Sequence, residues 1–116
     1  TISAFFIVLL LWYPAFENLF SIIRKFYFFK SPMHPDNNHL HQLLYFFLTK
    51  KLSWNKVLLN NSVGLLINFY NFTILFIGAT KPNHTQFMIF LIFVNLIVYI
   101  SLYLGLLQFK NFYLKK

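Results

Sequence analysis

The chain has 116 residues, of which 59% are hydrophobic, 22% aromatic and only 10% charged. A soluble domain of this length cannot bury 17 phenylalanines together with long aliphatic runs, so the composition indicates an integral membrane protein. The net charge of +8 is typical of cytoplasmic membrane loops rather than of a nucleic-acid surface, because the basic residues do not share one aromatic platform. The absence of cysteine excludes disulfides, thiol catalysis and thiolate metal sites. We therefore expect an all-α, multi-span helical bundle in a lipid bilayer, with no nucleic-acid partner.

The first predicted span, residues 1–23, begins with the apolar run TISAFFIVLLLWY. As a helix this run reaches only about 20 Å against a hydrocarbon core of about 30 Å, so the span continues past Pro14, begins upstream, or both. Pro14 should kink the helix, and Glu17 should lie at the membrane boundary, paired with Arg24 or Lys25. The apolar start without a methionine indicates that residues 1–116 are a C-terminal fragment of one membrane domain.

The long polar interruption, residues 24–56, contains SPMHPDNNHLHQ between basic flanks. Its Ser-Pro and His-Pro dipeptides disfavour helix before Asp36, which is expected to cap a helix over residues 37–48. This helix is too short and too polar at its start to span, so it is predicted to lie at the membrane surface.

Two further spans are predicted, residues 57–79 and 87–107, joined by a turn at 80–86 and followed by a tail at 108–116. Six of the ten Lys and Arg residues lie in the loop at 24–56, one in the turn and three in the tail. The positive-inside rule then places the loop and the tail in the cytoplasm and the turn outside.

The second span carries small and amide residues at helical spacing, mostly on one face. In lipid such residues pack against other helices, which suggests a larger bundle. They are Asn61, Gly64, Asn68, Asn71 and Gly78. In the third span, Asn95, Ser101 and Gly105 are possible helix contacts.

The histidines of the loop raise two chemical possibilities. A zinc site is not favoured, because His39 and His41 are about 200° apart on a helix and no further ligand follows at a familiar spacing. Binding of phosphate fits better, since Arg24, Lys25, His39 and His41 can all donate to phosphate oxygens, and the start of the loop helix would add amide groups. The alternative is a basic loop that only contacts anionic lipid.

Residues 14–45 read PAFENLFSIIRKFYFFKSPMHPDNNHLHQLLY. This stretch resembles the C-terminal part of the polyprenyl-phosphate N-acetylhexosamine-1-phosphate transferases. The matching positions are Pro14, Glu17, Arg24-Lys25, Ser31-Pro32, Pro35-Asp36, His39 and His41. Glu17 replaces the more usual Asp, and Gln42 stands where many members have a further His, which puts an acid–base role at that position in doubt.

The resemblance implies a bacterial inner-membrane enzyme that starts cell-envelope polysaccharide synthesis. Undecaprenyl phosphate attacks the β-phosphorus of a UDP-N-acetylhexosamine, UMP leaves, and a lipid-linked diphospho-sugar remains. Mg²⁺ (or Mn²⁺) would be bound by carboxylates in upstream Asp-rich motifs, so no catalytic or metal ligand is expected in this fragment, which alone should be inactive. The expected substrate-binding residues are Arg24, Asp36, His39, His41 and Gln42. The alternative role for Asp36 is that of a helix cap alone.

A second interpretation is a small three-span scaffold or assembly protein whose basic loop holds anionic lipid. It predicts that lysine can replace the loop histidines, because lipid adhesion needs only positive charge. A transporter fragment is less favoured, since no intramembrane acid or base accompanies the amides of the second span. A homodimer is compatible with each of these interpretations.

Overall fold

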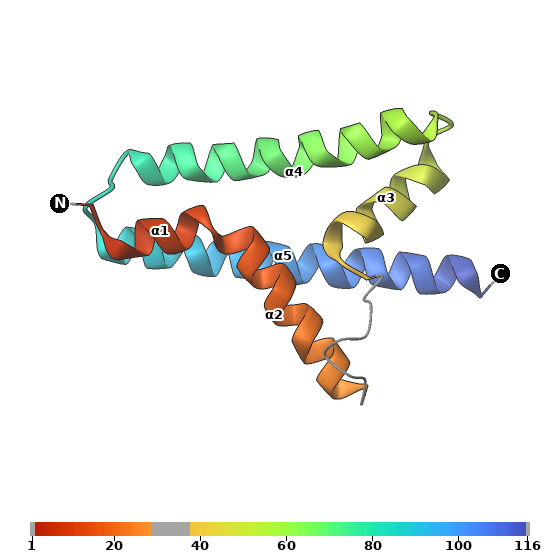
Figure 1. The fold of residues 1–116 in the computed structure, drawn as a ribbon, viewed down its shortest axis with the longest axis horizontal. Helices are drawn as coiled ribbons and strands as arrows, with labels where there is room; N and C mark the ends of the chain where they lie inside the picture. The colour runs from red at the N-terminus through yellow and green to blue at the C-terminus, as the bar shows by residue number, and fades with distance from the viewer. Residues whose placement is uncertain (1, 29–37, 116) are drawn as a thin grey trace.

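The computed structural model describes residues 2–28 and 38–115, and all secondary structure in these ranges is helical, as predicted. Figure 1 shows α4 and α5 as two long antiparallel helices, with the shorter helices placed against them. The five helices are α1 (Ala4–Leu10), α2 (Trp12–Tyr27), α3 (Leu40–Lys51), α4 (Lys56–Ala79) and α5 (Thr85–Leu114).

The helices α4 and α5 are each long and apolar enough to cross a membrane, and α1 with α2 would make a third span if the bent pair is counted as one. Large apolar side chains on their outer faces remain uncovered. Phe69 and Phe76 of α4 are 74% and 76% exposed, and Ile97 of α5 is 64% exposed. Lipid contact explains these surfaces, because water-exposed apolar area of this extent is unfavourable.

The first predicted span is broken between α1 and α2 by a bend of 68° at Leu11. Pro14 explains the bend. A proline within a helix lacks the N–H that would bond to the carbonyl of Leu10, and its ring collides with that carbonyl. The N–H of Leu11 still bonds to Ile7 at 3.2 Å, and the ladder resumes when Ala15 donates to Leu11. The expected kink is therefore present, and α2 continues to Tyr27 rather than ending at residue 23.

The loop helix α3 begins later than predicted. It starts at Leu40 instead of residue 37, and its N-cap is His39, not Asp36, which lies outside the described residues. The helix lies between the start of α4 and the second half of α5 and contacts both (Figure 1). Leu43 is 1% exposed, so α3 is anchored by burial between two long helices.

The last helix corrects two predicted boundaries. The turn after α4 is shorter than predicted, because α5 already begins at Thr85, where the side chain of His84 accepts a hydrogen bond from Phe87. The predicted tail at 108–116 is helical through Leu114 and continues α5 without a break. Its last turns pack against α3 through the rings of Phe109 and Phe47, whose centroids are 4.9 Å apart.

Two separate groups of buried side chains hold the helices together. The turn-end cluster joins α1, α4 and α5 and consists of Leu9, Ile74, Met88 and Leu91. The loop-end cluster joins α2, α3 and α5 and consists of Trp12, Leu40, Leu43, Tyr99 and Tyr103. Among the amides predicted to make helix contacts, Asn95 is fully buried and accepts a hydrogen bond from the Tyr70 hydroxyl at 2.8 Å. Ser101 and Gly105 are exposed.

Candidate functional site

Glu17 joins the two halves of the sequence stretch that carries the family resemblance. Its carboxylate is 6% exposed on α2 and bonds to two groups at the start of α3. Oε2 lies 2.7 Å from Nδ1 of His39, and Oε1 accepts the Leu40 backbone N–H at 2.8 Å. The expected pairing with Arg24 or Lys25 at a membrane boundary is thus replaced by a buried ion pair with His39. A carboxylate here also complements the positive end of the α3 dipole.

The contact with Glu17 fixes the orientation of the His39 ring. A carboxylate accepts hydrogen bonds, so the tautomer that suits this contact is the one in which Nδ1 donates to Oε2. A carboxylate behind a histidine fixes both the ring orientation and the tautomer. The backbone N–H of His39 donates to Oε1 of Gln42 at 3.0 Å, so Gln42, a predicted binding residue, also helps to cap α3.

The two predicted histidines lie side by side. The rings of His39 and His41 have centroids 5.7 Å apart and planes inclined by 9°. The separation of 200° was expected only for a helix over both residues, and it does not occur because His39 precedes the helix in extended conformation, with φ of −66° and ψ of 155°. The structure therefore places both imidazoles at the N-terminal end of α3.

Arg24 lies in the last turn of α2, with its guanidinium carbon 4.7 Å from the ring centroid of Tyr103. The buried Tyr99 lies within electrostatic range of both Arg24 and Glu17, and Tyr13 lies within that range of Glu17. Aromatic faces stabilise a guanidinium while leaving its N–H edge for anions. Arg24 and Glu17, the partner of His39, therefore both lie near Tyr99.

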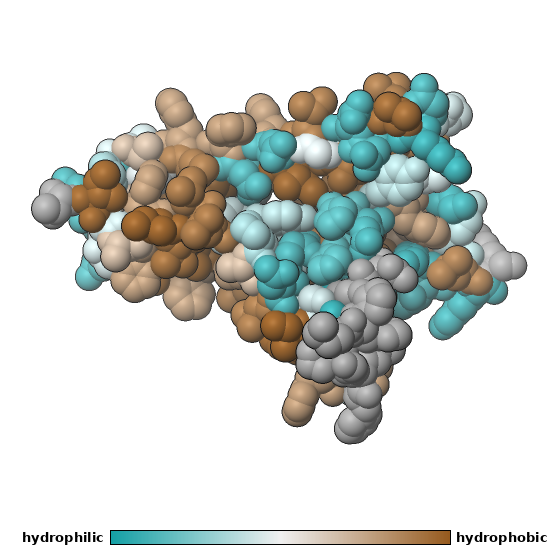
Figure 2. Space-filling view, viewed as in Figure 1, coloured by the Kyte–Doolittle hydropathy of each residue, from teal (hydrophilic) through white to brown (hydrophobic). Residues whose placement is uncertain are grey.

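Two polar hollows extend from this region along α4. The first, of about 530 Å³, is lined by His41, Gln42, Tyr45, Lys56, Val57 and Asn60. The second, of about 250 Å³, is lined by Tyr13, His41, Asn60, Val63, Gly64, Ile67 and Asn68. Because His41 and Asn60 line both, the hollows form one groove, which we call the α4 groove. Figure 2 shows polar side chains gathered on this face, beside the apolar side chains around α1.

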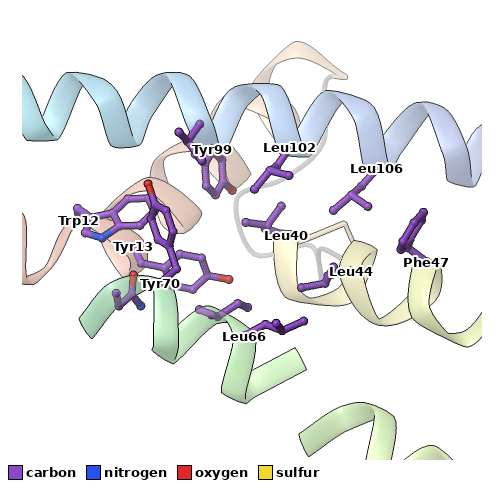
Figure 3. A pocket seen from close by; sticks show the side chains of 13 residues that line it. Trp12, Tyr13, Leu40, Leu44, Phe47, Leu66, Tyr70, Tyr99, Leu102 and Leu106 are labelled. Carbon is purple, nitrogen blue, oxygen red and sulfur yellow. The ribbon is translucent and has the colours of Figure 1, made fainter. Parts of the chain in front are cut away.

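An apolar cavity of about 330 Å³ lies on the other side of Tyr13. It is enclosed by α2, α3, α4 and α5. Figure 3 shows Tyr99, Leu102 and Leu106 of α5 facing Leu40 and Leu44 of α3 across it. Tyr13 and Ile67 line both the α4 groove and this cavity, so the two compartments adjoin at these two side chains.

The described residues do not provide a magnesium site. They contain no group of three or more His, Cys, Asp or Glu side chains that could hold a metal ion. Their one carboxylate, Glu17, already uses both oxygens in bonds to His39 and Leu40. Mg²⁺ requires several oxygen ligands in octahedral geometry, so we derive no step through a metal bound by these residues.

Apart from His41 and Gln42, the residues that line the groove were not among the predicted site residues; the polar ones nearest these two in the first hollow are Tyr45, Lys56 and Asn60. A sequence signal exists for Asn60, because Asn60, Gly64 and Asn68 recur at intervals of four and therefore share a helix face. The predicted stripe used Asn61 instead, which is exposed away from the groove, and its last member, Gly78, is buried against α1. Asp36, the remaining predicted site residue, lies outside the described part of the chain.

Comparison with known proteins adds no assignment. No protein-family model matches the chain, and no curated protein or solved structure matches it.

Proposed function

We propose that the chain is the substrate-binding part of a membrane transferase that moves a sugar-1-phosphate from a UDP-N-acetylhexosamine to undecaprenyl phosphate and releases UMP. The carboxylates that hold Mg²⁺ would lie outside these 116 residues. In this proposal the protein is a multi-pass protein of the bacterial inner membrane, and the His-containing loop and the C-terminal end of α5 face the cytoplasm.

The observation that carries the proposal is the bond between Glu17 and His39. These residues are 22 positions apart, in the two halves of the stretch that resembles the transferases, yet their side chains are 2.7 Å apart. A buried carboxylate is costly unless it is paired, so such a residue suggests a functional role. Here the pairing orients the imidazole of His39 beside that of His41, which lines the α4 groove.

The charges around the groove suit a pyrophosphate. His41 and Lys56 line it, so an imidazole and an ammonium group, both hydrogen-bond donors, lie on one hollow, while Arg24 lies on α2 over the ring of Tyr103. In phosphoryl transfer the protein acts chiefly by positioning the phosphates and stabilising negative charge. The amides of Asn60 and Asn68 offer donors and acceptors suited to the sugar or uracil, and these roles are part of the proposal.

The apolar cavity beside Tyr13 suits the other substrate. An isoprenoid phosphate has a charged head and an apolar chain, so it needs a polar and an apolar compartment that adjoin. In this assignment the chain enters between α3, α4 and α5, and the phosphate meets the donors near His39. Attack by its oxygen on the β-phosphorus breaks the bond to the bridging oxygen, which leaves with UMP.

The test uses the complete open reading frame that contains this chain, expressed in membranes lacking the host enzyme for this reaction. We expect label from UDP-N-acetyl[¹⁴C]glucosamine to enter a butanol-extractable lipid and UMP to be released in equal amount. His41→Ala should reduce turnover by about 10²-fold or more if its hydrogen bond stabilises transition-state charge. Lys81→Gln, at the far turn, is the matched control and should retain full turnover.

Two results would contradict the proposal. One is the absence of lipid-linked sugar from the complete protein with any UDP-N-acetylhexosamine. The other is full activity of a well-expressed His41→Ala variant. Transfer catalysed by residues 1–116 alone would instead contradict the placement of the metal site outside this chain.

A further inference from the structure

Aromatic rings and lysines form a cluster where the C-terminal ends of α3 and α5 meet, although these two ends are far apart in the sequence. Four rings contact each other there: Phe46 and Phe47 of α3 meet Phe109 of α5, and Tyr113 meets both Phe46 and Phe109. Centroid distances range from 4.9 Å for Phe47–Phe109 to 6.4 Å for Phe46–Phe109. We call these rings, with the lysines described next, the lysine–aromatic cluster.

Three lysines sit on these rings. Nζ of Lys50 lies 4.8 Å from the ring centroid of Tyr113, and Nζ of Lys51 lies 5.5 Å from that of Phe109. Nζ of Lys110 lies 5.8 Å from the Phe46 centroid, and Lys50 approaches the same ring at 5.4 Å. Each distance is within the range of a cation–π contact. Two of the lysines come from the loop helix and one from α5, so only the fold brings them together.

The positive charge of the cluster is not balanced by an acidic side chain. Glu17 is the one carboxylate among the residues that the structure describes, and it is bound to His39 and Leu40. Lys110 donates a hydrogen bond to the neutral Oδ1 of Asn38 at 2.9 Å. The negative ends of the α3 and α5 dipoles offset part of the charge, but they leave three ammonium groups gathered on adjoining rings.

The position of the cluster points to its ligand. It lies at the C-terminal end of α5, one of the two helices that are apolar enough to cross a membrane, and Figure 1 shows the start of α4 at the same end of the bundle. Aromatic rings and lysines together are typical of the membrane–water boundary, where anionic headgroups are found. A lysine ammonium binds phosphate as a point charge with three donors.

We propose that the lysine–aromatic cluster is a binding site for the phosphodiester headgroup of an anionic glycerophospholipid. The lysines bind the phosphate, and the rings adjoin the first part of the acyl chains. The site is separate from the α4 groove and does not depend on the transferase proposal.

The test measures lipid retention by the full chain, purified in detergent and incubated with phosphatidylglycerol or phosphatidylcholine of identical acyl chains. Native mass spectrometry should show preferential retention of phosphatidylglycerol, on the order of tenfold. The triple variant Lys50→Gln/Lys51→Gln/Lys110→Gln should lose this preference. Lys81→Gln is the matched control, because Lys81 also lies over a ring, Phe87, at 5.4 Å but at the opposite end of the bundle. It should retain the preference.

Equal retention of both lipids by the unaltered chain would overturn the proposal, as would an unchanged preference in the triple glutamine variant. Displacement of phosphatidylglycerol by inorganic phosphate at comparable concentration would assign the site to free phosphate instead. If the glutamine variant loses helicity, the triple arginine variant is measured instead. It keeps the positive charge and should keep the preference for phosphatidylglycerol, so a folded arginine variant without that preference would also contradict the proposal.

Discussion

The two ends of the helical bundle are built differently. At the turn end, α1, α4 and α5 approach closely around Gly78, where an added Cβ would lie 2.7 Å from Cδ2 of Leu9. Ser3 ties the chain start to the turn, donating its N–H to Pro82 O at 2.8 Å and sharing a hydrogen bond with Thr85 Oγ1 at 2.9 Å. At this end, small and apolar side chains of α1, α4 and α5 are in direct contact.

At the loop end, α4 and α5 are separated by α3, and the intervening space contains the α4 groove and the apolar cavity (Figures 1 and 3). Its contacts are aromatic and charged rather than close-packed and small. The added Cβ at Gly64 would meet nothing within 4 Å. The turn end is thus closely packed, while the loop end, although it has its own buried cluster, leaves open space between α3, α4 and α5.

The largest expected effect is at the loop end. Glu17→Ala should lower the free energy of unfolding by about 3 kcal/mol, because it leaves His39 and the first N–H of α3 without their buried partner. Glu17→Gln should cost less, since its amide oxygen can still accept from Leu40. Unfolding of the full chain in mixed micelles of increasing SDS, followed by circular dichroism, measures both. Equal stability of Glu17→Ala and the unaltered chain would contradict the structural role of this pair.

A matched pair of glycine substitutions compares the two ends directly. Gly78→Leu should destabilise the chain by about 1–3 kcal/mol, because overpacking forces Leu9 and the backbone apart. Gly64→Leu should leave the stability nearly unchanged, since its surroundings are open. The same unfolding measurement applies. A similar loss for both variants would show that packing at the two ends does not differ in this way.

The Gly64→Leu variant also tests the α4 groove. Its side chain would enter the groove between Asn60 and Asn68, so under the proposed transferase function the complete protein should show a raised KM for the UDP-sugar although the chain is stable. An unchanged KM would place the sugar nucleotide elsewhere.

The smallest expected effect concerns the hydroxyl pair at the turn end. Ser3→Ala and Thr85→Val should each cost about 0.5–1.5 kcal/mol, the usual net contribution of a neutral hydrogen bond. A double-mutant cycle should give a smaller coupling energy for Ser3 with Thr85 than for Glu17 with His39. A larger coupling at the turn end would reverse the comparison drawn here.

The sequence alone was sufficient for features that depend on local composition. The long apolar segments predict α4 and α5, and Pro14 predicts the break between α1 and α2, because helix length and the missing proline N–H are properties of the segment itself. Boundaries set by side chains from elsewhere were harder to predict. The start of α3 at Leu40 depends on a cap from Glu17, 23 residues earlier.

Tertiary structure decided which residues meet. The sequence suggested that Glu17 pairs within its own helix and that His39 and His41 diverge, since both inferences assumed local helical geometry. In the structure Glu17 is buried against the start of α3, where it bonds to His39 and not to a residue of its own helix. This pairing avoids the cost of a buried carboxylate without a partner. In the same way, the fold alone brings Lys50, Lys51 and Lys110 onto one group of rings, since Phe46 and Lys110, which are 64 positions apart, approach each other only after α3 packs against α5.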